Sequence, residues 1–190
     1  MSIGKRIHFG KFGIINCMSN LTNKNIFVTG GTGLVGSHLV SRILELNPSK
    51  VVCLCRSKDP SSLFYSENMD AQVISAYGDL KDKERIFDLV SKHEINYIFH
   101  FAAQPIVPTA FVNPYETLDT NIMGTVNVLE AARLSPYTQG VVVASSDKAY
   151  GKDCVLAEEG HPLAGDHPYD VSKSCADLIC TTYAKTYKVP

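Results

Sequence analysis

The sequence predicts an α/β domain built on a doubly wound parallel sheet, with three layers in the order α/β/α. Strand-like and helix-like segments alternate from residue 25 onward, which is typical of a parallel sheet with helical crossovers. The second strand-like segment, KVVCLC, is almost continuously apolar, as in strands buried on both faces. The chain has 190 residues, enough for one domain with a sizeable core.

Apolar periodicity and the residues that end helices define the individual elements. The helix after the first strand has apolar residues at helical spacing and is followed by Pro48, and a later helix has Pro114 in its first turn. Residues 59–70 fit either a surface loop or a weak helix. In chain order we expect strands at 25–29, 50–55, 72–76, 96–101 and 140–144, and helices at 34–46, 82–93, 115–133 and 168–187.

Composition excludes several classes of protein. The formal net charge is −1 and no block of five like charges occurs, so nothing indicates a nucleic-acid or anionic-membrane surface. No apolar run approaches the roughly 18 residues of a membrane span. The six cysteines form no CxxC pair and have no histidines at metal-ligand spacing, so we expect free thiols and no metal site. With no signal-peptide pattern, these features predict a cytoplasmic protein.

The turn after the first strand has the spacing GxxGxxG and leads directly into a helix. The first glycine permits a tight turn, the second lets backbone approach a pyrophosphate, and the third lets helix pack on strand. Backbone N–H groups at the helix start then bind phosphate. An ordinary glycine-rich turn is the alternative, and Ser37 excludes a GxxxxGK[ST] loop. The cofactor-binding residues predicted here are Gly30, Thr32, Gly33, Leu34, Val35 and Gly36.

This turn makes the fold Rossmann-type, and it defines two segments of the chain. Residues 1–24 are predicted to be an N-terminal extension that can be disordered, and 25–190 an NAD(P)-binding Rossmann domain. The chain stops after the helix at 168–187, where another strand normally extends the sheet. We therefore expect the domain to be incomplete at its C-terminus.

Residues at the carboxyl ends of the next two strands indicate how the adenosine half of the cofactor is bound. A Rossmann strand usually ends there with an acidic residue for the ribose 2′-hydroxyl, but this sequence has Arg56. Arginine suits a 2′-phosphate, so Arg56 favours NADP over NAD, with a solvated surface arginine as the alternative. Asp79 and Leu80, beyond the third strand, are placed to touch the adenine, although an ordinary turn aspartate fits the spacing too.

Two segments near the end of the chain carry candidate catalytic groups. Tyr169 and Lys173 lie four residues apart at the start of a helix and so share a face, where the lysine charge can make the tyrosine a base at neutral pH. Ser146, Asp147 and Lys148 follow the fifth strand, whose carboxyl end faces the same cleft as the glycine turn. The alternative for Tyr169 and Lys173 is an ordinary helix surface, where both residue types are common. The alternative for the segment after the fifth strand is a polar turn that caps a helix.

Two further segments belong to the same cleft. Phe101, Ala102, Ala103 and Gln104 end the fourth strand with mostly small residues that allow a flat cofactor close to the backbone. Asn121 is a poor helix former in the middle of a predicted helix, which a buried amide bonded to backbone would explain. We interpret His100 as a structural core residue.

The motifs TGGTGLVG, HFAAQP, NIMGT, SSDKAYG and YDVSK occur in that order, and with them the sequence resembles the extended short-chain dehydrogenase/reductases, specifically the NAD-dependent, nucleotide-sugar epimerase/dehydratase family. The resemblance covers residues 25–190, and HFAAQPIV, SSDKAYG and HPYDVSKSCADL are most similar to CDP-glucose 4,6-dehydratases. It implies NAD or NADP as cofactor and a nucleoside-diphosphate sugar as substrate. Cofactor contacts from Tyr169 and Lys173, and homodimerisation through the helices at 115–133 and 168–187, are also implied.

The implied reaction converts a nucleotide hexose into its 4-keto-6-deoxy form by transient hydride transfer. Tyr169, assisted by Ser146 and Lys173, would remove the proton of the 4-hydroxyl, Lys148 the C5 proton, and Asp147 would protonate the departing 6-hydroxyl. Two alternatives remain open: a 4-epimerase, which needs no acid at Asp147, and a non-catalytic cofactor-binding fragment. The resemblance also implies a C-terminal substrate lobe that binds the nucleotide and sugar. Because the chain is expected to be truncated before this lobe, it is predicted to be inactive alone.

Overall fold

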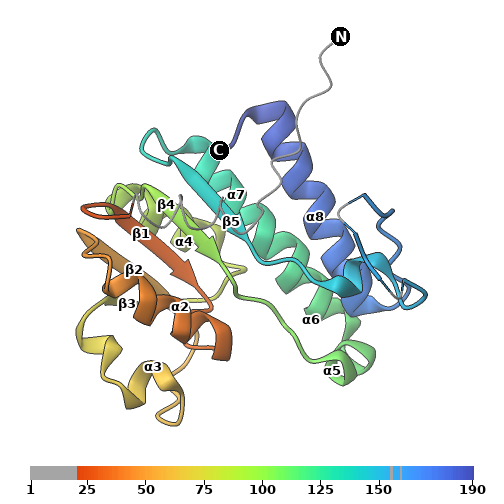
Figure 1. Ribbon diagram of the computed structural model, residues 1–190, viewed down its shortest axis with the longest axis horizontal. Helices are drawn as coiled ribbons and strands as arrows, with labels where there is room; N and C mark the ends of the chain where they lie inside the picture. Colours follow the sequence, from red (N-terminus) through yellow and green to blue (C-terminus); the bar gives the residue numbers. More distant parts are fainter. Residues whose placement is uncertain (1–20, 155, 159) are drawn as a thin grey trace.

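Five parallel strands form one sheet in the order β3-β2-β1-β4-β5 (Figure 1). The chain winds outward from β1 to β3 and then crosses back to β4 and β5, so the order reverses between β1 and β4. This confirms the doubly wound parallel sheet and puts the switch point where such folds bind their ligands. The strands are β1 (Asn25–Thr29), β2 (Lys50–Cys55), β3 (Ile74–Tyr77), β4 (Tyr97–His100) and β5 (Gly140–Val143).

The computed structural model describes residues 21–154, 156–158 and 160–190. Its α-helices are α2 (Leu34–Leu44), α3 (Leu63–Ser66), α4 (Lys83–Lys92), α5 (Val107–Val112), α6 (Pro114–Leu118), α7 (Gly124–Leu134) and α8 (Pro168–Tyr187). The segment left open between loop and helix contains α3 and a 3₁₀ turn, η1 (Met69–Ala71). The short helix α5 was not predicted, because six residues are too few to show helical periodicity.

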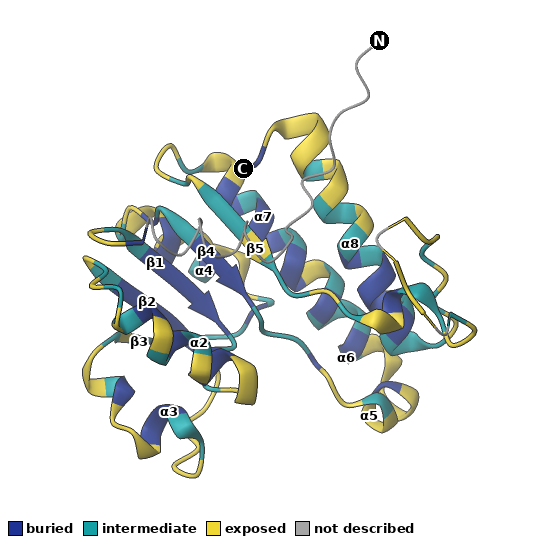
Figure 2. Ribbon diagram, in the orientation of Figure 1, coloured by how far each residue is buried: buried dark blue, intermediate teal, exposed yellow. Residues whose placement is uncertain are grey.

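Two apolar clusters cover the two faces of the sheet and make the three layers. Figure 2 shows β1, in the middle of the sheet, as largely buried. Side chains of β1 alternate between them: Ile26 and Val28 join the cluster that contains residues of α2 and α3. Phe27 joins the other, which contains residues of α4 and α7. Successive strand residues point to opposite faces, so this alternation buries β1 on both sides and explains the apolar run at residues 26–28.

The helix predicted over 115–133 is present, with a change of winding in its middle. Asn113 caps α6 by accepting a hydrogen bond from the Glu116 amide, at 3.2 Å. A π-helical turn, η2 (Asp119–Met123), then connects α6 to α7. Single π turns inside helices often occur at functional sites, and this one carries Asn121.

Residues 21–24, the last four of the predicted N-terminal extension, contact the domain. Leu21 is fully buried in the cluster under α2, and the Thr22 hydroxyl donates to the Leu46 carbonyl at 3.0 Å. Residues 21–24 therefore pack on the domain, since an apolar side chain at this position covers the end of the core. Residues 1–20, the rest of the predicted extension, lie outside the described residues.

The last residues of the chain lie against β5. Val189 is buried in the cluster with α4 and α7, and the Pro190 carbonyl accepts a hydrogen bond from the Val141 amide at 2.9 Å. The chain thus returns to the edge strand after α8, beside the sheet, as Figure 1 shows. In the part of the chain that the structure describes, no helix has the length and apolarity needed to span a bilayer.

Candidate active site

The glycine turn brings separate pieces of backbone into close approach. Gly30 has φ of +74°, a left-handed conformation, and a Cβ there would lie 2.6 Å from the Ala102 nitrogen. A Cβ on Gly36 would collide with the carbonyl oxygen of Gly30. Gly33 is less confined, since its Cβ would lie 3.3 Å from that same oxygen. Only glycine therefore fits at Gly30 and Gly36 without moving backbone.

The helix α2 starts at the end of this turn with its first amides open. Gly33 is its N-cap, no side chain caps it, and its first turn contains no acidic residue. The first N–H groups of a helix have no intrahelical partner and form the positive end of the dipole. Leu34 and Val35, in this first turn, are 81% and 63% exposed although apolar. The arrangement suits a bound anion such as a pyrophosphate, with apolar side chains beside it.

The predicted adenosine contacts lie on the same edge of the sheet but differ in exposure. Arg56 is exposed directly after β2. Asp79 is half-buried after β3, and its Oδ1 accepts a hydrogen bond from the Lys81 amide at 2.8 Å. Leu80 is only 6% exposed and packs in the core, where a Cβ on Gly124 would collide with it. The Leu80 side chain therefore supports the sheet and does not line an open site.

The end of β4 lies beside the glycine turn. Phe101, Ala102 and Ala103 are half-buried, and the Ala102 amide donates to the Thr29 hydroxyl at 3.2 Å. Behind them His100 is 3% exposed, with Nδ1 2.7 Å from the Thr29 hydroxyl and Nε2 3.2 Å from a second threonine hydroxyl, on Thr125. Burial, with a smaller contribution from the Lys173 charge, lowers the pKa of His100 to about 3. The imidazole is thus a neutral bridge in the core.

Gln104 and Asn121 form a buried network in which the oxygen and nitrogen of both side-chain amides are hydrogen-bonded. The Asn121 amide accepts from the Gln104 nitrogen at 2.7 Å and donates to the Gln104 carbonyl at 3.2 Å and to the Ser172 hydroxyl at 2.9 Å. The Gln104 amide group donates to the Thr117 hydroxyl at 2.8 Å and accepts from the Ile106 nitrogen at 2.6 Å. Both side chains therefore hold the loop after β4 against α6 and α8.

Ser146, Asp147 and Lys148 lie together at the carboxyl end of β5, where they begin the 3₁₀ turn η3 (Asp147–Tyr150). The Ser146 hydroxyl caps this turn by accepting from the Lys148 amide at 3.2 Å, and it donates to Asp147 Oδ1 at 3.2 Å. The Lys148 ammonium is 3.6 Å from Asp147 Oδ2, and these side chains are 51% and 76% exposed. A hydroxyl, a carboxyl and an amine are thus presented to solvent within one turn.

Tyr169 and Lys173 project from the first turns of α8. Tyr169 is half-buried, and its hydroxyl makes no hydrogen bond within the described residues. Lys173 is 8% exposed, and its ammonium donates to the Ala144 carbonyl at the end of β5, at 3.0 Å. Burial lowers the pKa of Lys173. The lysine thus connects the helix of Tyr169 to the strand that leads to Ser146.

Two more hydrogen bonds join this strand end to α8. The Ser145 hydroxyl donates to Asp177 Oδ2 at 3.2 Å, and the Ser174 hydroxyl donates to the Ala149 carbonyl at 2.8 Å. The structure therefore brings the five predicted catalytic residues to adjoining parts of β5, η3 and α8. Arg56 and Asp79 lie with the strands on the other side of β1.

Sequence reasoning missed the hydroxyl groups that organise the site. Thr29 accepts a hydrogen bond from the Ala102 amide, and Thr125 donates one to the Asn121 carbonyl. Ser172 accepts one from the Asn121 side-chain amide. The signal for Ser172 was its place inside YDVSK, between the tyrosine and the lysine. Nothing in the sequence identified Thr29, which ends a strand like many threonines.

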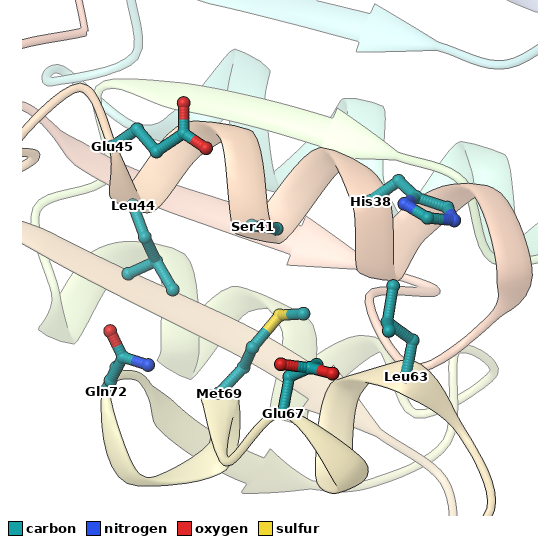
Figure 3. A pocket seen from close by; sticks show the side chains of 8 residues that line it. All are labelled: His38, Ser41, Leu44, Glu45, Leu63, Glu67, Met69 and Gln72. Atoms are coloured by element: carbon teal, nitrogen blue, oxygen red, sulfur yellow. The ribbon is translucent and has the colours of Figure 1, made fainter.

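A groove of about 570 Å³ lies elsewhere, between α2 and the segment of α3 and η1 (Figure 3). It contains none of the predicted site residues, and its lining mixes charged, polar and apolar side chains: His38, Ser41, Leu44, Glu45, Leu63, Glu67, Met69 and Gln72. Among the described residues, no group of three or more His, Cys, Asp or Glu side chains is arranged to hold a metal ion.

Comparison with known proteins identifies the family and shows how much of it this chain spans. A family model described as GDP-mannose 4,6 dehydratase matches residues 27–190. CDP-glucose 4,6-dehydratase of Salmonella typhimurium is 32% identical over 169 residues, which are 88% of this chain and 47% of that protein. A putative UDP-glucose 4-epimerase of Methanocaldococcus jannaschii is 28% identical over 86% of this chain and 52% of its own. The chain thus spans about half the length of these relatives.

Solved structures show the same fold with cofactor and substrate bound. UDP-glucose 4-epimerase of Thermotoga maritima, with UDP-glucose, has a TM-score of 0.77 and 26% identity over 87% of this chain and 52% of its own. The dTDP-glucose 4,6-dehydratase of Streptomyces venezuelae, with NAD bound, has a TM-score of 0.76 and 26% identity over 87% of this chain and 53% of its own. The comparisons confirm the predicted resemblance to extended short-chain dehydratases and epimerases.

Proposed function

This chain belongs to the GDP-mannose 4,6 dehydratase family, and we propose that it carries the cofactor-binding and catalytic residues of a nucleotide-sugar 4,6-dehydratase. The proposed substrate is CDP-glucose or a similar nucleoside-diphosphate hexose, and the product is its 4-keto-6-deoxy form. The observation that carries this proposal is the placement of Asp147 beside Ser146, with Oδ1 3.2 Å from the hydroxyl, opposite the helix of Tyr169 and Lys173.

The residues of the glycine turn fit a nicotinamide dinucleotide. Glycine is required where backbone approaches backbone at Gly30 and Gly36, and the uncapped start of α2 is suited to the pyrophosphate. When bound, this cofactor accepts a hydride from the sugar and later returns it. Arg56 would face the ribose, and its guanidinium favours NADP, whereas the relatives cited above include one with NAD bound.

In this proposal Tyr169 is the first base. Its unbonded hydroxyl is available to the sugar 4-hydroxyl, from which it takes the proton while Ser146 donates a hydrogen bond to the same oxygen. The Lys173 ammonium, on the same helix face, stabilises the phenolate. Its bond to the Ala144 carbonyl keeps that charge at the end of β5.

The exposed pair after Ser146 performs the elimination in this proposal. Once C4 is a ketone, the C5 proton is acidic, and Lys148 removes it as a base. Asp147 gives a proton to the departing 6-hydroxyl, which leaves as water. Lys148 ends the step protonated and Asp147 ionised, so one proton returned from the lysine to the carboxylate resets the pair. Both side chains are exposed and 3.6 Å apart, so solvent can carry this proton.

A 4-epimerase is the second candidate, because solved epimerases share this fold and the relatives include one named as a putative epimerase. It would use Ser146, Tyr169 and Lys173 alike but would not need Asp147. A non-catalytic cofactor-binding protein is the third, and the intact Ser146, Tyr169 and Lys173 argue against it.

Asp147→Asn separates the dehydratase from the epimerase. Loss of the acid is expected to slow formation of the 4-keto-6-deoxy product about a hundredfold or more, because general-acid groups contribute on that scale. The protein as it occurs in its native source is incubated with CDP-glucose, and the product is identified by mass spectrometry and NMR. Lys152→Gln is the control, since Lys152 is an exposed neighbour paired with Asp166. An unchanged dehydration rate in Asp147→Asn would sink this assignment.

The groups that grip the sugar are proposed to lie beyond this chain, as the relatives are about twice its length. The 190-residue chain alone is then expected to bind cofactor and to lack turnover. An intact mass well above 20.8 kDa for the protein from its native source supports this. A mass of 20.8 kDa favours the non-catalytic reading.

We also propose a cytoplasmic homodimer that uses α6, α7 and α8. The described cysteines Cys53, Cys55, Cys154, Cys175 and Cys180 are all free, which is ordinary in a reducing compartment. Leu178 and Tyr187 on α8 are 56% and 53% exposed, and Met123 before α7 is 47% exposed. Leu178→Glu is expected to shift the sedimentation profile toward a monomer, and an unchanged profile counts against this interface.

A further inference from the structure

A carboxyl group is buried at the start of α8, directly after Tyr169. Asp170 is 1% exposed, and its Oδ1 lies 3.0 Å from Nε2 of His167, the N-cap residue of the helix. Neither Oδ1 of Asp170 nor Nδ1 of His167 has a hydrogen-bond partner among the described residues. The contact between the two side chains is therefore an electrostatic one at short range, without the alignment of a hydrogen bond.

The pair lies where three elements meet. The His167 ring packs on the Phe111 ring of α5, with centroids 5.2 Å apart and 31° between planes. On the other side, the Ser174 hydroxyl accepts from the Gly165 amide at 3.2 Å and donates to the Ala149 carbonyl of η3. A Cβ on Gly165 would collide with the backbone of Asp170. Figure 1 shows α5 and α6 beside this end of α8.

The charges around Asp170 show that the pair has an energetic cost. Burial raises the pKa of the Asp170 carboxyl, and the charge of His167 opposes that rise. Asp166, Lys148 and Asp147 also act on it, with opposing signs. Two helices, α5 and α6, pack against this end of α8. The first contains no titratable residue, and the carboxylate of the second, Glu116, is paired with Lys81.

Asp170 is buried, whereas the His167 side chain is 22% exposed. An ionisable pair that removes a carboxyl from water gives little net stability, and apolar side chains would fill the same corner at less cost. Its best-attested use is to fix one arrangement among several. We propose that His167 and Asp170 are positioning residues for Tyr169: the pair seats the first turn of α8 against α5 and η3, so that the Tyr169 hydroxyl faces the Ser146 turn. The catalytic role of Tyr169 rests on the proposed function. The packing of the first turn of α8 against α5 and η3 does not depend on that function.

Amide hydrogen exchange over residues 169–175 of the 190-residue chain tests the seating directly. His167→Gln leaves the buried carboxyl without its partner, so exchange in this segment is expected to become about tenfold faster. The double variant His167→Gln/Asp170→Asn removes both members and is expected to return exchange to within about threefold of wild type. Lys185→Gln is the control, since this exposed residue lies on the same helix near its other end.

Titration with NAD+ and turnover of CDP-glucose by the native protein complete the test. His167→Gln is expected to lower kcat about tenfold and to leave the Kd for NAD+ within about twofold, with the double variant recovering most of kcat. Exchange at the wild-type rate in His167→Gln, or no recovery in the double variant, overturns the proposal. Absence of turnover in wild type would defeat the proposed function instead, and the exchange comparison would still decide the pair.

Discussion

The glycine turn and the end of β5 form two halves of one candidate site, but different kinds of contact hold them. In the glycine half, segments of backbone lie in direct contact at Gly30 and Gly36, within a turn of seven residues. In the catalytic half, side chains of α8 join segments 25 to 32 residues away, through Ser174, Lys173 and Asp177. The first half is thus sensitive to added atoms, and the second to removed polar groups.

Gly36→Ala should have the largest effect, because an added methyl collides with a carbonyl that cannot move alone. We expect NAD+ binding to be lost, together with a fall of about 2 kcal/mol in the free energy of unfolding. Calorimetric titration and urea denaturation measure the two effects. Gly160→Ala is the control, since a Cβ there meets nothing within 4 Å. Normal NAD+ binding by Gly36→Ala would contradict the close approach described for this turn.

Tyr169→Phe should break the catalytic half and leave the cofactor half intact. Loss of the base is expected to lower turnover about a thousandfold, with the Kd for NAD+ within about threefold of wild type. Tyr183→Phe provides a matched control on the same helix, because its hydroxyl donates to Glu130 at 2.8 Å, away from the site. That control should lose about 1 kcal/mol of stability and keep its turnover. Equal losses of turnover in the two variants would remove Tyr169 from the mechanism.

His100 joins the two halves and should make the fold sensitive to acid. Its pKa is about 3 in the folded state against an ordinary 6.5, so the unfolded chain binds more protons between these values. Stability should therefore fall as pH drops from 6.5 toward 3. His100→Gln should flatten this part of the curve, measured by urea denaturation at several pH values. Thr125→Val, which removes a partner and keeps the imidazole, should retain the slope, and a retained slope in His100→Gln would contradict this account.

Arg56→Ala should give the smallest effect, confined to one cofactor. Loss of an exposed guanidinium is expected to weaken NADP+ binding about tenfold and to change NAD+ binding by less than about twofold. Lys58→Ala, a neighbouring exposed cation, is the matched control. If both cofactors bind Arg56→Ala as they bind wild type, Arg56 is a solvated surface residue and the preference for NADP is wrong.

The features predicted correctly from sequence are those that depend on neighbours in the chain. The strand, glycine turn and helix around Gly30 to Gly36 have their signal within a dozen residues. The one-turn spacing of Tyr169 and Lys173 is equally local, and their catalytic role stays a prediction. Residue types there are restricted by local geometry, such as a positive φ or a one-turn spacing.

The features that were missed depend on contacts between distant segments. Asn121 was predicted as a buried amide, but its partner Ser172 is 51 residues away and could not be identified from spacing. The side chains of Leu80 and Gln104 pack in the core and bond the loop after β4, which the sequence did not indicate. Their cofactor contact stays a prediction. The sequence also contained no signal for the His167–Asp170 pair, because the pair is covered by α5 and η3, which are distant in the chain.

The most direct test of the proposed function is the isotopic content of the product formed from CDP-glucose in D2O. A 4,6-dehydratase that removes the C5 proton should give a product lighter than the substrate by one water and carrying one solvent deuterium at C5. Mass spectrometry and proton NMR of the purified product show both changes at once. A C4 epimer of unchanged mass, with no deuterium, would contradict the dehydratase assignment and the roles given to Asp147 and Lys148.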